Sequence, residues 1–196
     1  MTHTLHRQGN EEALKSDYAM LAMAAAGIND KKPDTREKLI RIGEIFKQHN
    51  PANIMMENLW SISPAITAAF TDIETVKEIL KTLKNEDLGI SIVISGIISE
   101  IQKTVEEIGL KMHTVHLSLG VFGKKELLPS EKTLEITTMC GHHCISPQSV
   151  ESYVEKIKNG KTTIEKAAEK LAKPCVCGIF NSERAKNILN ELVQIK

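Results

Sequence analysis

The sequence predicts an α/β fold in which a small mixed or parallel sheet is covered by helices, with a C-terminal three-helix unit containing every cysteine. Three observations predict it. Strand patterns alternate with helix patterns between residues 65 and 119, an order typical of crossover connections. Residues 90–94 form a β-branched, mostly apolar run, as expected for a buried central strand. Three helix patterns then follow one another after Ser146.

The N-terminal third predicts two helices. The first begins near Glu11 and places Leu14, Tyr18 and Leu21 on one apolar face. The second begins at Asp34, where an acidic residue three positions on completes a capping pattern, and ends at Asn50-Pro51.

Strands are predicted at residues 65–70, 90–94 and 113–119, with a helix capped by Asp72 and another after Gly96 between them. This order fits either a split ferredoxin-like arrangement or a small doubly wound sheet. Residues 131–139 fit a short helix and a strand equally well. We therefore expect an α/β domain over residues 1–130 and a helical cysteine unit over residues 131–196 packed on it, or one continuous domain.

Composition narrows the class of protein. The 196 residues are 41% hydrophobic and 26% charged, which is an ordinary globular balance. The net charge of zero argues against a nucleic acid or an anionic membrane as partner. Residues 1–7 lack the apolar core of a secretory signal, and the most apolar run is too short to span a bilayer. These features predict a cytoplasmic protein, in which clustered cysteines bind metal or do redox chemistry more often than they form disulfides.

The hairpin between the cysteine clusters predicts that they meet. Its first helix runs from Ser146 to the stop at Gly160, and its second from Thr162 to the residue before Pro174. Because the link is short, the two helices should lie antiparallel, with the entrance beside the exit. One cysteine cluster precedes the entrance directly and the other follows the exit. We therefore expect a single site.

The site chemistry is predicted from the ligand types and their spacing. The C-x3-C and C-x-C clusters supply six candidate metal ligands: Cys140, His142, His143, Cys144, Cys175 and Cys177. Four thiolates suit zinc or an iron–sulfur cluster. The C-x-C spacing fits more easily when the two thiolates reach different irons, which favours an iron–sulfur cluster over zinc. Gly141 and Gly178 each follow a cysteine and would let the backbone approach such a cofactor, unless they only form turns.

Two other functions use the same residues. One is a structural zinc protein with a binding role. The other is a metal-free thiol redox enzyme, in which Cys140 attacks, His142 or His143 is the base, and Cys175 or Cys177 resolves the disulfide. Helix N-termini near Ser146 and Ser182 are expected to lower the pKa of nearby thiols. A small-molecule substrate or a redox protein would be the partner. The sequence leaves open whether the protein is an enzyme.

Overall fold

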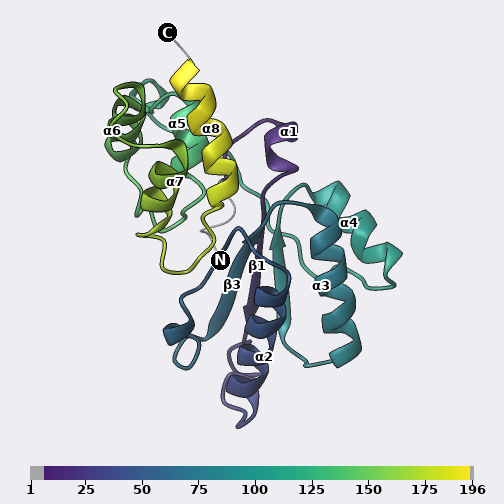
Figure 1. Ribbon diagram of the computed structural model, residues 1–196. Coiled ribbons are helices and arrows are strands. Elements are labelled where there is room, and N and C mark those ends of the chain that lie inside the picture. The colour runs from purple at the N-terminus through teal and green to yellow at the C-terminus, as the bar shows by residue number, and fades with distance from the viewer. Residues whose placement is uncertain (1–6, 195–196) are drawn as a thin grey trace.

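The computed structural model describes residues 7–194, so the expectation about a secretory signal falls almost entirely outside the described residues. The described chain is a mixed α/β structure (Figure 1). Its elements, in chain order, are α1 (Glu11–Leu14), β1 (Tyr18–Met23), α2 (Thr35–Gln48), β2 (Asn53–Ile54), η2 (Glu57–Leu59), β3 (Ala65–Phe70), α3 (Ile73–Glu86), β4 (Ser91–Ser95), α4 (Ile98–Glu107), η3 (Lys125–Leu127), α5 (Glu131–Thr137), α6 (Pro147–Lys158), α7 (Ile164–Ala172) and α8 (Ser182–Gln194).

The sheet has the strand order β2-β3-β1-β4, and every neighbouring pair is antiparallel. The predicted parallel or mixed sheet is therefore wrong. Strands β3 and β4 do point the same way across the α3 crossover, but β1 lies between them and pairs with both. The element order β-α-β-β-α-β with this separation is the split β-α-β arrangement, one of the two alternatives that the sequence left open.

The first predicted helix is the main error in the N-terminal third. Asn10 caps a helix of only four residues, and the chain then enters β1 at Tyr18. The first five residues of β1 are at most 2% exposed. A strand buried on both faces shows no polar alternation, so its apolar residues matched a helical spacing as well as a strand. The second predicted helix is confirmed as α2.

The next elements follow the sequence closely until residue 108. Strands β3 and β4 and helices α3 and α4 lie where predicted, and the Asp72 side chain accepts the N–H of Thr75 at 2.7 Å. The strand predicted at residues 113–119 is wrong, because this segment has no regular secondary structure. Its apolar side chains are exposed, up to 88% at Leu119. Residues 131–137 form the helix alternative, α5.

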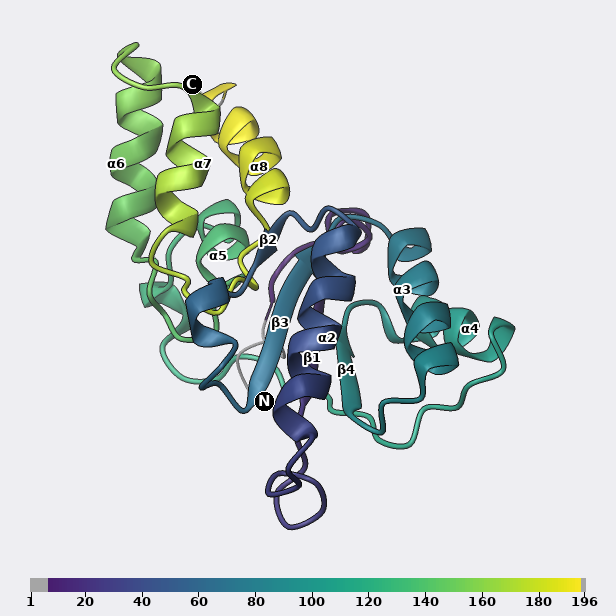
Figure 2. The same cartoon turned by 60° about the horizontal axis from the view of Figure 1, so that its bottom comes forward.

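Some helices pack on the sheet, and others lie beyond one of its edges (Figure 2). Helix α2 packs on β1 and β3, α3 packs on β3 and α2, and α4 packs on α3. Helices α5 to α8 gather beyond the β2 edge, away from α3 and α4. The three helices predicted after Ser146 are present as α6, α7 and α8. Over the described residues, no helix has both the length and the apolar character needed to cross a membrane.

Candidate functional site

The hairpin α6–α7 forms as its capping residues predict. The Ser146 side chain accepts the N–H of Ser149 at 3.1 Å, with proline in the first helical turn. The hairpin turns after Asn159 at Gly160, which adopts a left-handed backbone with φ of 66°. Helix α7 is capped by Thr163 and not by the predicted Thr162. Helices α6 and α7 pack against each other, so the hairpin entrance lies near its exit.

The two cysteine clusters meet, as the hairpin geometry predicted. The Cys140 thiol forms hydrogen bonds within both clusters, with Cys144 and with Cys175. The Cys175 and Cys177 Sγ atoms lie 3.6 Å apart. The Cys177 Sγ lies 3.7 Å from Nδ1 of His142. Five of the six predicted ligands therefore belong to one connected set of side chains.

This set has a buried end and an open end. Cys140, Cys175 and Cys177 are 0%, 4% and 9% exposed, and they form part of the hydrophobic core. Cys144 and both histidines are exposed. His143 has a left-handed backbone with φ of 54°, and its N–H donates to the Cys140 carbonyl at 3.1 Å, which closes the turn through the half-buried Gly141. A ligand would reach the buried sulfurs past Cys144 and His142.

The thiol pKa values do not follow the prediction of general lowering by helix N-termini. The hydrogen bond to Cys175, followed by burial, raises the pKa of Cys140. The hydrogen bond with Cys140 lowers the pKa of Cys175, but the hydrogen bond with Cys177 and burial together raise it to about 11. Burial also raises the pKa of Cys144, and only Cys177 has a lowered pKa, caused first by its hydrogen bond with Cys175. Cys177 is therefore the thiol of this set that loses its proton most readily.

Backbone N–H groups also point at the sulfurs. The N–H groups of His142 and Cys144 donate to Cys140, that of Phe180 donates to Cys175, and that of Ile179 donates to Cys177. Each of these bonds favours the thiolate form. Such N–H donors come from the turns themselves and not from the first turns of α6 and α8. They would stabilise thiolates bound to a metal, because a ligating sulfur stays negatively charged.

The segment around Cys175 and Cys177, the second cysteine loop, packs against the edge of the sheet. Met56 N–H donates to the Val176 carbonyl at 3.3 Å, and the Thr67 hydroxyl donates to the Cys177 carbonyl. Gly178 has φ of 70°, and a Cβ there would lie 2.0 Å from the carbonyl carbon of Ile54. The missing side chain of Gly178 therefore lets the loop approach the β2 backbone. Its predicted role toward a cofactor stays a prediction, as does that of Gly141.

The cysteine and histidine side chains of the two clusters contact one another in a line and not around a common centre. Across residues 7–194, no three or more His, Cys, Asp or Glu side chains surround a common point as ligands of a metal ion would. One spacing does suit a metal. In a tetrahedral site with Zn–S bonds of about 2.3 Å, two sulfurs lie about 3.8 Å apart, close to the 3.6 Å between Cys175 and Cys177. The donor chemistry and the N–H groups fit a metal, whereas Cys144 and His142 would have to turn to enclose one.

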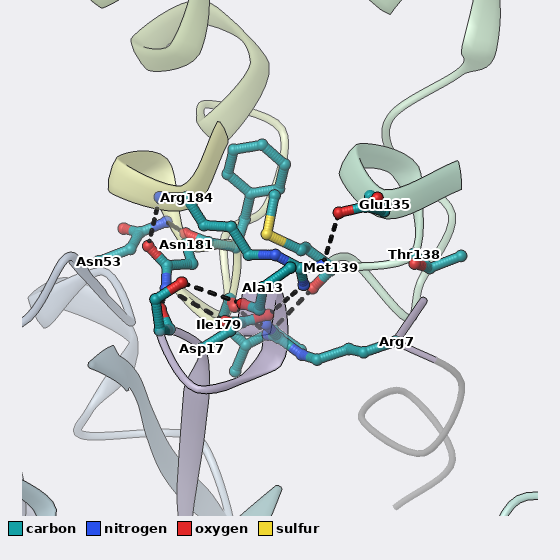
Figure 3. Close-up of polar contacts among 12 residues, drawn as sticks. Arg7, Ala13, Asp17, Asn53, Glu135, Thr138, Met139, Ile179, Asn181 and Arg184 are labelled. Atoms are coloured by element: carbon teal, nitrogen blue, oxygen red, sulfur yellow. Dashed lines mark hydrogen bonds and ion pairs between the residues drawn. The ribbon is translucent and has the colours of Figure 1, made fainter. Parts of the chain in front are cut away.

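Charged residues beside the site escaped the sequence analysis. Arg7, Asp17, Glu135 and Arg184 form a buried network between the N-terminal segment, β1, α5 and α8 (Figure 3). A signal was present in the last helix, because Arg184 lies four residues before Ile188 and so on the apolar face. A charge on a buried face predicts a buried partner, but nothing in the sequence identifies which one.

No family model matches the chain, and neither a curated protein nor a solved structure matches it.

Proposed function

We propose that this protein binds a metal centre through the thiolates of Cys140, Cys144, Cys175 and Cys177. The observation that carries the proposal is the convergence of all four cysteines, from two clusters far apart in the sequence, into one connected set. Soft thiolate ligands select zinc, copper(I) or iron–sulfur clusters. A cytoplasmic location belongs to the proposal, because thiols stay reduced there.

A single tetrahedral ion such as zinc is the centre that the sulfur contacts favour. The 3.6 Å separation of the two sulfurs in C-x-C answers the objection that this spacing cannot serve one small ion. The buried sulfurs are also packed against one another, whereas a cluster would hold thiolates on separate irons and therefore further apart. When bound, zinc would tie the hairpin to the β2 edge, with the exposed Cys144 as the ligand nearest to solvent.

An iron–sulfur cluster is the second candidate. It is supported by the backbone N–H groups directed at three of the sulfurs, since hydrogen bonds to sulfur tune such clusters. A redox or catalytic function would follow from this candidate, with a small molecule or a redox protein as partner. His142, beside Cys177, is the side chain best placed to approach that centre.

Metal analysis of anaerobically purified protein tests the proposal. Colourless protein with about one zinc per chain supports the single ion, and cobalt substitution should then give intense thiolate charge-transfer absorption. Brown protein with iron and sulfide supports the cluster. Each single Cys→Ser variant should lose metal, whereas His116→Ala, in the irregular segment before α5, should keep it. Protein without metal whose cysteines form a reversible disulfide would overturn the proposal in favour of a thiol redox enzyme.

A further inference from the structure

Four buried charges meet beside the thiol site and balance one another (Figure 3). Asp17 forms ion pairs with Arg7 and with Arg184, the latter at 2.7 Å, and Arg184 reaches Glu135 at 3.2 Å. The four side chains are between 0% and 7% exposed. Two positive and two negative groups leave no net charge in this quartet of Arg7, Asp17, Glu135 and Arg184. Buried ion pairs contribute little net stability, but they can specify one arrangement of the segments that they join.

Arg7 joins the two cysteine loops directly. One of its terminal nitrogens donates to the Met139 carbonyl at 3.3 Å and to the Ile179 carbonyl (Figure 3). Met139 immediately precedes the first cysteine of C-x3-C, and Ile179 lies two residues after the last cysteine of C-x-C. A single guanidinium thus holds together two backbone segments that each carry buried thiols. The Arg7–Asp17 ion pair orients this guanidinium from the other side.

The rest of the quartet holds the same junction. Arg184 donates to the Gln8 carbonyl at 2.6 Å, which fixes the backbone beside Arg7. Asn181 caps α8 through the N–H of Arg184 and donates to the Ser16 carbonyl at 2.8 Å. These hydrogen bonds between protein groups link the N-terminal segment, the start of β1 and the segment after Cys177.

We infer that Arg7 is a positioning residue which, with the quartet, preforms the thiol site before any metal binds. That the site serves to bind metal rests on the proposed function, whereas the role of Arg7 in arranging the thiols does not. A zinc finger orders its ligands only when the metal binds. Here the carbonyls on either side of the cysteines are already tied together. The metal should therefore enter and leave a folded protein.

The decisive variants exchange Arg7 for Met and for Lys. Arg36→Met is a matched control, because Arg36 also donates to two carbonyls, those of Trp60 and Ser63, outside both cysteine loops. We expect Arg7→Met to bind zinc about 10- to 100-fold more weakly, as substitutions behind metal ligands do, and Arg36→Met to match the wild type. Arg7→Lys keeps the charge beside Asp17 but loses the planar fork, so it should fold and still bind more weakly.

A second readout works without metal. Phenylarsine oxide binds two adjacent thiols, forming two As–S bonds and releasing its oxygen as water. Chelated wild-type protein should bind it tightly, and Arg7→Met at least about tenfold more weakly, because small displacements of reacting groups have effects of this size. If the wild type binds the arsenical more tightly than Arg7→Met does, but holds neither zinc nor an iron–sulfur cluster, the proposed function fails and the positioning inference stands.

Equal zinc and arsenical affinities for the wild type and both Arg7 variants would overturn the inference. Loss of amide-exchange protection in α5 to α8 of the chelated wild type would overturn it as well, since that outcome would mean that the metal orders the site. If Arg7→Met does not fold, the zinc and arsenical affinities of Arg7→Lys test the inference instead.

Discussion

At the β2 edge of the sheet the cysteine loop covers the strand, whereas the β4 edge borders a cavity of about 590 Å³. The cover at β2 consists of backbone and side-chain hydrogen bonds to residues 175–182, including Asn53 to the Phe180 carbonyl and Ser182 to the Ala52 carbonyl. The cavity at β4 is lined by apolar side chains of α3, β4 and α4 and by residues 110–118. A sheet edge needs a partner for its backbone, and within residues 7–194 the β2 edge obtains one from the distant segment 175–182.

The two sides also differ in how they use charge. Beyond β2, the quartet is buried and joins four segments. Beside β4, Lys77 and Glu107 join α3 to α4 by an ion pair that is partly exposed. An exposed pair is weakened by solvent and contributes little, whereas loss of one member of a buried pair leaves a charge without its partner. The thiol site is therefore part of the covered β2 edge, and substitutions there should be tolerated poorly.

The largest expected effect comes from Gly178→Ala. Its Cβ would overlap the Ile54 and Met55 backbone, at 2.0 Å and 2.2 Å, in a left-handed conformation. We expect a loss of more than about 4 kcal/mol in the free energy of unfolding, or no folding. Gly160→Ala is the control, since it has φ of 66° and no atom within 4 Å of the added carbon. It should cost about 1 kcal/mol. Similar urea midpoints for the two variants would contradict the seating of the loop on β2.

A smaller effect is expected from Thr67→Val, which keeps the shape but removes the donor to the Cys177 carbonyl. Thr67 is 3% exposed, so the carbonyl would lose a buried hydrogen bond. We expect a loss of about 1 to 2 kcal/mol in urea unfolding. Thr82→Val removes an exposed hydroxyl that donates to the Glu78 carbonyl at 3.1 Å and should change stability by less than about 0.5 kcal/mol. A neutral Thr67→Val would show that the edge is held by other bonds.

The smallest effect is expected at the β4 side. The hydrogen bond from Lys77 lowers the pKa of Glu107 below its ordinary value of 4.5. Because the folded-state pKa is depressed, the stabilisation is present above that value and is lost as the pH falls through the lowered pKa. Glu107→Gln should therefore slightly reduce stability at neutral pH and flatten the decline in acid. Thermal unfolding between neutral pH and pH about 3 measures this, with the exposed Glu126→Gln as control. An unchanged acid decline would contradict the assignment.

Much of the candidate site could be predicted from the sequence, because it depends on local signals. Ser146-Pro147 and Asn159-Gly160 bound a helix by capping chemistry, and a short link makes two helices antiparallel whatever surrounds them. The meeting of Cys140 with Cys175 follows from those facts alone. The order of contacts among the thiols could not be predicted, and neither could the raised pKa of Cys140, because both depend on burial and on which sulfur touches which.

Two predicted elements of the fold show the same difference between local signals and long-range contacts. Residues 18–23 were predicted as helix because a strand buried on both faces has no alternation to mark it, and only its pairing with β3 and β4 makes it a strand. Residues 113–119 alternate as a strand should, yet they lack secondary structure, because hydrogen bonds to a neighbour and not side-chain pattern define a strand.

By itself, the sequence determined helices α2, α3, α4, α6, α7 and α8 to within a few residues, and the convergence of the two cysteine clusters, since caps and apolar spacing act within a few residues of each other. Only the tertiary structure decided the antiparallel strand order, the burial of the quartet and the seating of Gly178 on β2. These depend on contacts between segments as distant as Arg7 and Ile179, and no local pattern records which distant group will satisfy a buried charge or an open sheet edge.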